Sequence, residues 1–168
     1  MASKIKVGTG FDVHPLTPGR RLVLGGVDIP FDRGLGGWSD ADVLTHAVMD
    51  ALLGAAALGD IGVHFPSGEP QYKDISSLTL LERVRDKLTE HGWRVANTDA
   101  TIVAEQLRLR DFIDGMRQKL SQALGIAVSQ VSVKASTSNG LGFVGRGEGI
   151  AAHAVAMIEG SKYESMKV

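Results

Sequence analysis

The sequence contains no cysteine, and that absence removes several kinds of site at once. Disulfide frameworks, iron–sulfur clusters, cysteine-ligated zinc and a thiol nucleophile are all excluded. Aromatic residues make up only 5% of the 168 residues, so small aliphatic side chains must fill the core and supply most of the 43% apolar fraction. Any transition-metal site therefore has to draw on histidine, aspartate and glutamate.

The chain also lacks an excess of positive charge and a long apolar run. Its formal net charge is −1, so a nucleic-acid partner held by bulk charge is not expected. The longest apolar region, 43–58, is interrupted by His46 and Asp50 and is too short for a bilayer, which requires about 20 apolar residues. The first ten residues lack the apolar stretch of a signal peptide. We expect a cytoplasmic protein without a membrane partner.

The spacing of apolar and turn-forming residues predicts one α+β or α/β domain over residues 1–160 and a polar tail over 161–168. The longest predicted helix begins at an N-cap formed by Ser39 or Asp40 and ends near Leu58. Residues 150–158 fit either a strand or a helix. The other predicted elements are strands at 4–11, 93–104 and 129–136, a hairpin at 21–29, and helices at 76–91 and 111–124.

A metal site is indicated by acidic residues and histidines in the first half of the chain. No lysine or arginine occurs between residues 33 and 73, whereas Asp42, His46 and Asp50 follow one another at helical spacing. Asp42 can equally belong to a solvent-facing stripe, but the apolar surroundings of His46 and Asp50 favour a ligand role. Asp12 and His14 project to the same side of an extended segment. Together with His46 they form the Asp/His2 pattern of a catalytic zinc with one open position.

Phosphate ligands are expected in the second half of the chain. Lys134 is followed by the hydroxyls of 136–138, and groups of this kind at a strand end suit phosphate oxygens. The glycines at 142, 145, 147 and 149 permit close approach of the backbone or a strained turn without a ligand. Arg108 and Arg110 lie in a loop before a predicted helix and could contact an anion, but from the sequence alone solvated surface charge is the better interpretation of both.

Four long motifs together resemble the 2-C-methyl-D-erythritol 2,4-cyclodiphosphate synthase family. They are GFDVHPL (10–16), SDADVLTHAVMDALLGAAALGDIGVHFP (39–66), TIVAE (101–105) and VKASTSNGLGFVGRGEGIA (133–151). Their order and spacing match the family over nearly the whole chain. The resemblance implies an α+β domain with a mixed β-sheet covered by helices on one face, assembled as a homotrimer with active sites between subunits.

The implied reaction belongs to non-mevalonate isoprenoid synthesis. It converts 4-diphosphocytidyl-2-C-methyl-D-erythritol 2-phosphate to the cyclic 2,4-diphosphate and CMP. Asp12, His14 and His46 match the Zn²⁺ ligands of the family. A second divalent cation, Mg²⁺ or Mn²⁺, would be bound mainly through the substrate phosphates.

The resemblance also assigns roles to residues outside the metal group. The catalytic candidates are Ser39, Asp60 and Thr137. The candidates for contacts to the substrate are Asp60, Ile61, Gly62, Ala104, Arg108, Leu109, Lys134, Ala135, Ser136, Thr137, Phe143 and Arg146. Arg146 and Glu148 match residues near the threefold axis, where relatives hold isoprenoid diphosphates or other anions.

Two positions depart from the family pattern. Trp38 stands where the family usually has histidine, which removes a polar contact near the substrate phosphates. Asn139 stands where the family usually has the glutamate that ligates the second metal, and an uncharged amide should bind that ion more weakly. These two departures keep open a second hypothesis, a metal-dependent phosphohydrolase. The glycine-rich segment 142–149 motivates a third, a metal-stabilised trimeric protein that binds isoprenoid diphosphates or nucleotides without turnover.

Overall fold

The computed structural model describes residues 4–160, so the predicted tail at 161–168 lies outside the described residues. Five strands form a mixed sheet in the order β4-β1-β7-β5-β6, and β2 pairs with β3 in a separate hairpin. Their bounds are β1 Ile5–Pro18, β2 Leu22–Leu24, β3 Val27–Ile29, β4 Arg33–Leu35, β5 Trp93–Val103, β6 Val131–Ser136 and β7 Gly149–Gly160. Only β5 and β6 run parallel among these pairs.

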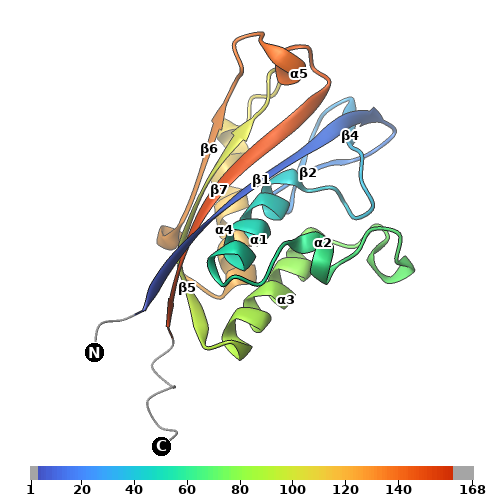
Figure 1. Ribbon diagram of the computed structural model, residues 1–168. Helices are drawn as coiled ribbons and strands as arrows, with labels where there is room; N and C mark the ends of the chain where they lie inside the picture. The colour runs from blue at the N-terminus through green and yellow to red at the C-terminus, as the bar shows by residue number, and fades with distance from the viewer. Residues whose placement is uncertain (1–3, 161–168) are drawn as a thin grey trace, which may run out of the picture.

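The three long helices, α1, α3 and α4, lie together on one side of the sheet (Figure 1). The α-helices span α1 Val43–Ala55, α2 Ile61–His64, α3 Ser77–Glu90, α4 Ile113–Leu124 and α5 Gly142–Gly145, and short 3-10 turns occupy 70–72, 110–112 and 128–130. The buried core forms between these helices and the sheet, from leucine, alanine, valine and isoleucine side chains. The predicted α+β class, with a mixed sheet and helices on one face, is confirmed for the described residues.

The predicted boundaries of the first long helix were wrong at both ends. Its N-cap is Asp42, because that carboxylate accepts hydrogen bonds from the backbone N–H and the hydroxyl of Thr45. The helix ends at Ala55, because Ala57 adopts a left-handed conformation (φ 59°) and the Leu58 N–H bonds back to the Leu53 carbonyl.

The ambiguous segment 150–158 is a strand, and it is central to the fold. Strand β7 pairs antiparallel with β1 on one side and with β5 on the other. The predicted hairpin at 21–29 is confirmed, with its turn at Gly25-Gly26. The predicted strand at 4–11 continues to Pro18, and the short elements β4, α2 and α5 were missed. No helix among residues 4–160 has the length and apolar character needed to cross a membrane.

Candidate metal centre and active site

The metal candidates meet because α1 packs unusually close to β1. A Cβ atom on Gly8 would lie 2.1 Å from the Ala51 carbonyl oxygen, and one on Gly10 would lie 1.9 Å from the Ala47 carbonyl oxygen. Both distances are impossible for a real side chain, so these positions require glycine. Asp12 and the residue two places on continue the same face of β1. The close contact therefore brings α1 against the polar end of the strand.

Asp12, His14 and His46 form a group that can hold a metal ion. The Asp12 Oδ2 atom lies 2.8 Å from His14 Nε2 and 3.0 Å from His46 Nδ1. The two imidazole nitrogens are 3.2 Å apart. Ligands about 2.0–2.1 Å from a tetrahedral ion lie roughly 3.3 Å from one another, so the three atoms match one face of such a site.

Electrostatics in this group favour a charged Asp12. Burial by itself would raise the pKa of Asp12, but hydrogen bonds to His14 and His46 hold that pKa well below its ordinary value. Burial lowers the pKa of His14, yet the hydrogen bond to Asp12, the charge of Asp12 and the contact with the Gly36 carbonyl together outweigh burial and raise that pKa. The carboxylate thus stabilises positive charge at this point, whether a proton or a cation supplies it.

The outer nitrogens of both imidazoles have partners that leave the inner nitrogens free to ligate. His14 Nδ1 lies 2.7 Å from the Gly36 carbonyl oxygen, which can only accept, so Nδ1 carries a proton and Nε2 is the nitrogen left to ligate a cation. His46 Nε2 lies 2.9 Å from the Ser77 hydroxyl. Metal-binding histidines usually have a second partner of this kind. The residues present therefore fit a divalent metal ion.

A cavity of about 220 Å³ opens onto the metal group. Ser39, predicted as a catalytic residue, lines it together with Ile61 and Gly62, which were predicted to contact the substrate, beside the three candidate ligands. Its other lining residues, which the sequence did not predict for the site, are Phe65, Ser67, Tyr72 and Leu80, with Trp38 at the rim. Asp60 is exposed and caps α2 through a hydrogen bond from the Val63 N–H (3.1 Å).

Neither Asp42 nor Asp50 joins the metal group. Asp42 is fully buried, and besides capping α1 it accepts hydrogen bonds from the N–H groups of Gly25 and Gly26. The solvent-facing interpretation of Asp42 was therefore wrong. Asp50 accepts from the Ile61 N–H at 2.9 Å, and burial raises its pKa. The Asp50 carboxylate thus anchors the first residue of α2 and is not part of the metal group. The sequence-based expectation of a ligand role for Asp50 was therefore wrong.

A second cavity, of about 680 Å³, is lined in part by the end of β6, the edge strand farthest from β4 and β1 in the sheet. It brings together Arg108, Leu109 and the end of β6, all predicted for nucleotide binding. Arg110 also lines it, and neither arginine makes an ion pair within residues 4–160. The β6 residues that line it are Ala135, Ser136 and Thr137. Unpaired guanidinium groups facing hydroxyls suit an anionic ligand.

The remaining predicted residues lie outside these two cavities. Ala104 is buried, with 4% of its surface exposed. Lys134 forms an ion pair with Asp99 on the neighbouring strand β5. Phe143 lies on α5 with 39% exposure, and Arg146 pairs with Glu148 at 2.9 Å. The single chain therefore does not bring every predicted residue to one point.

Glu105 organises the turn that follows β6, and this role was not predicted, although the resemblance assigns the range 104–109 to the nucleotide pocket. The Glu105 carboxylate accepts hydrogen bonds from the Ser138 N–H (2.9 Å), the Ser138 hydroxyl (3.0 Å) and the Gly140 N–H (2.7 Å). Those bonds, led by the one from the Ser138 N–H, hold the pKa of Glu105 below its ordinary value. Glu105 lies within the TIVAE motif, but its sequence position alone gives no sign of this contact.

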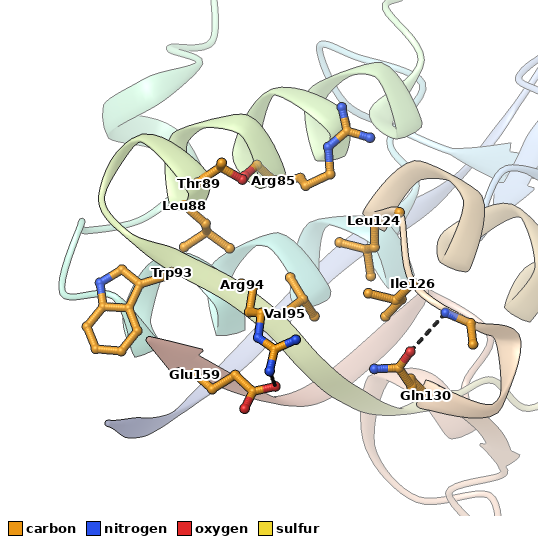
Figure 2. A pocket seen from close by; sticks show the side chains of 12 residues that line it. Arg85, Leu88, Thr89, Trp93, Arg94, Val95, Leu124, Ile126, Gln130 and Glu159 are labelled. Carbon is orange, nitrogen blue, oxygen red and sulfur yellow. Dashed lines mark hydrogen bonds and ion pairs between the residues drawn. The ribbon is translucent and has the colours of Figure 1, made fainter. Parts of the chain in front are cut away.

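A third cavity, of about 530 Å³, lies between the ends of α3 and α4 and the start of β5 (Figure 2). Its polar groups are largely satisfied within the chain. Arg85 donates to Asp86 and to the Ala123 carbonyl, and Arg94 pairs with Glu159. None of the predicted site residues lines this cavity. It therefore offers little polar chemistry to a ligand.

Comparison with known proteins places this arrangement in a family. The model of the YgbB family matches residues 5–159. A 2-C-methyl-D-erythritol 2,4-cyclodiphosphate synthase of Dehalococcoides mccartyi is 61% identical over 92% of this chain and 99% of its own length. The protein of that name from Moorella thermoacetica is 59% identical over 92% of this chain and 94% of its own length.

Solved structures agree with these sequence matches. The bifunctional IspDF of Campylobacter jejuni superposes with a TM-score of 0.91 and 38% identity, covering 95% of this chain and 43% of that longer chain. A CDP complex of IspF from Plasmodium falciparum superposes with a TM-score of 0.83 and 27% identity, covering 96% of this chain and 100% of the other. From its sequence, its fold and the metal group at the end of β1, this chain belongs to the YgbB family.

Proposed function

We propose that this chain is a cyclase of non-mevalonate isoprenoid synthesis. It converts 4-diphosphocytidyl-2-C-methyl-D-erythritol 2-phosphate to 2-C-methyl-D-erythritol 2,4-cyclodiphosphate and CMP. The observation that supports this best is the convergence of Asp12, His14 and His46 on a cavity of about 220 Å³, in a chain 61% identical to a curated synthase.

Asp12, His14 and His46 would hold Zn²⁺, which supplies Lewis-acid polarisation of a phosphate oxygen when bound. The chain's own residues then orient the substrate. Ser39 lies beside the metal group, and the Asp60 carboxylate with the backbone of 61–62 would hold the erythritol hydroxyls.

The nucleotide end of the substrate fits the cavity of about 680 Å³. Arg108 and Leu109 face Ala135, Ser136 and Thr137 there, and the Thr137 hydroxyl is our candidate for contact with the reacting phosphates. Four other residues would contact the substrate only in an assembly that adds the surface of another copy to these cavities. They are Lys134, Ala104, Phe143 and Arg146.

The reaction needs no nucleophile from the protein. An oxygen of the 2-phosphate forms a bond to the β-phosphorus, and the bond from that phosphorus to the bridging oxygen breaks. CMP leaves with that oxygen. Because both groups belong to one substrate, holding the chain folded for in-line attack is the main task of the site. A second cation, Mg²⁺ or Mn²⁺, would bind the substrate phosphates with weak help from Asn139.

We infer a homotrimer whose active sites form between subunits. The metal cavity and the nucleotide cavity share no lining residue. Two strands separate β1, which carries two of the metal-ligand candidates, from β6, which lines the nucleotide cavity, so these two strands lie roughly 14 Å apart at about 4.8 Å per strand. Joining the halves from neighbouring copies would complete each site. Arg146 and Glu148 would then lie near the axis, where an isoprenoid diphosphate or another anion could bind. A cytoplasmic location remains our sequence-based prediction.

The test is incubation of the purified protein with the cytidine substrate and Mg²⁺, followed by phosphorus NMR. Equal amounts of CMP and the cyclic diphosphate would support the cyclase. Linear phosphate products would instead support a phosphohydrolase. Tight binding of CMP or an isoprenoid diphosphate without turnover would support a binding protein. A His46→Ala variant supplies the control for the metal site.

A further inference from the structure

The hydroxyl of Ser77 lies between a candidate metal ligand and a carboxylate. Ser77 opens α3, and none of its surface is exposed. Its Oγ atom is 2.9 Å from His46 Nε2, the ring nitrogen that points away from the metal group. The same hydroxyl hydrogen-bonds to Asp40 Oδ1, and the Ser77 N–H donates to Asp40 Oδ2 at 3.0 Å.

Counting protons fixes the direction of each bond in this chain of contacts. The Asp40 carboxylate accepts, so the single hydroxyl proton of Ser77 is donated to Asp40. The Ser77 oxygen is then left with lone pairs, and the bond to His46 requires that Nε2 carry the ring proton. His46 Nδ1 is consequently the ring nitrogen left to bind a cation, and it faces Asp12 (3.0 Å) and His14 (3.2 Å).

Ser39 provides a weaker second contact to the same nitrogen. Its hydroxyl is 3.2 Å from His46 Nε2 and also accepts a hydrogen bond from the Ala41 N–H. Ser39 faces the cavity, whereas Ser77 is anchored by two bonds to one carboxylate. Ser77 is therefore the better fixed of the two partners.

We propose that Ser77, held by Asp40, is a positioning residue that sets the tautomer and ring orientation of His46 for metal binding. This inference rests on the proposed metal site. The corresponding partner of His14 is the main-chain carbonyl of Gly36, so only His46 depends on a replaceable side chain. Removing a partner of this kind typically weakens metal binding about 10–100-fold.

The experiment compares Ser77→Ala with the wild type by competition for Zn²⁺ against a chromophoric chelator. We expect binding to weaken by about tenfold or more in Ser77→Ala. Ser76→Ala is the matched control, because Ser76 also lies at the start of α3 but makes no side-chain capping bond. Asp40→Asn, which lies outside α3, replaces Ser77→Ala if that variant does not fold, and it should weaken binding in the same direction.

Nitrogen-15 NMR of the imidazoles in the metal-free protein provides a readout independent of metal. The wild type should show His46 protonated at Nε2, and Ser77→Ala should show a mixture of tautomers. His46→Gln identifies the signal. Zinc affinity in Ser77→Ala within twofold of the wild type, or an unchanged His46 tautomer, would overturn the inference. A wild type that binds no zinc would refute the metal site, while the tautomer would still decide this proposal.

Discussion

Asn139 occupies a left-handed backbone position (φ 54°) in the turn after β6. Its N–H donates to the Thr137 hydroxyl, and that hydroxyl donates to the Asn139 side-chain oxygen at 3.4 Å, so the amide lies beside the proposed phosphate site. Asparagine tolerates this conformation better than most residues. The turn therefore suits asparagine locally, although a carboxylate would be the stronger ligand for a magnesium ion.

We predict that Asn139→Glu lowers the Mg²⁺ concentration needed for half-maximal rate. The added negative charge strengthens cation binding. Glutamate tolerates the left-handed backbone at this position less well than asparagine, so the substitution should also lower the free energy of unfolding by about 1 kcal/mol. Magnesium titrations of the cyclisation rate measure the first effect, and urea unfolding measures the second. Asn139→Gln is the control, because it carries the same backbone cost without charge. A magnesium titration identical to that of the wild type would contradict the prediction.

Sequence reasoning located the strand half of the metal group from residues whose geometry is local. Asp12 and His14 share a strand face, and that relation follows from the two-residue period of extended backbone. It failed at Asp42 and Asp50, whose partners are backbone N–H groups of Gly25, Gly26 and Ile61. Those contacts depend on how distant loops fold against α1, which spacing along α1 cannot reveal.

At the scale of elements, the segment 66–74 forms part of the wall of the metal cavity, to which it contributes Ser67 and Tyr72. Two hydrogen bonds join it to the loop before α1, and Trp38 makes both. The Trp38 indole N–H donates to the Glu69 carbonyl at 2.9 Å, and the Trp38 carbonyl accepts from the Asp74 N–H at 2.9 Å. Trp38 lacks the polar contact expected of the family's histidine, but it ties this wall in place.

Trp38→Phe should loosen that wall without removing its aromatic surface. Losing one hydrogen bond of about 1 kcal/mol should speed backbone amide exchange in 66–74 roughly fivefold. Hydrogen–deuterium exchange with mass spectrometry of peptides from this segment provides the measurement. Trp93→Phe is the matched control, because Trp93 lies by the distant third cavity. Exchange in 66–74 that stays at the wild-type rate would show that Trp38 does not restrain the wall.

The predicted elements were accurate where the apolar periodicity was strong. The predictions were ambiguous or absent where strand pairing or elements of only a few residues determine the structure. Helix 76–91 matched α3, and strand 93–104 matched β5. The segment 150–158 remained ambiguous because alanine-rich sequence suits both structures, and pairing with β1 and β5 selects the strand. Elements of three or four residues, such as β4 and α2, contain too few positions to show a period.

At the scale of the whole molecule, the sheet has one face that the helices leave uncovered. Apolar side chains on that face are 42–62% exposed, which is high for a strand surface. They are Ile5, Val7, Phe11 and Val13 of β1 and Val155 of β7. His153 lies among them, with its ring 4.7 Å from that of Phe11. A second copy of the chain is the cover that a symmetric oligomer would provide.

Complementation between inactive variants tests whether each site draws on two copies. His46→Ala disables the metal cavity, and Arg108→Ala with Thr137→Ala disables the nucleotide cavity of a different chain. When the two variants are mixed in equal amounts and assemble at random as trimers, half of all copies have an intact metal cavity. The neighbour of any such copy has an intact nucleotide cavity in half of the cases. About one quarter of the sites should then recover, and the cyclisation rate should rise to that fraction of wild type.

The control mixture combines His46→Ala with a chain that has all three substitutions. No copy in that mixture has an intact metal cavity, so interfacial pairing cannot restore a site. Subunits must be exchanged by refolding from urea before the assay. Without this exchange, each trimer would consist of one variant only, and every site in it would have the same defect. Recovery in the first mixture alone would show that neighbouring chains complete one another's sites. A rate no higher than the mean of the two parents would mean that each chain performs the reaction with its own residues.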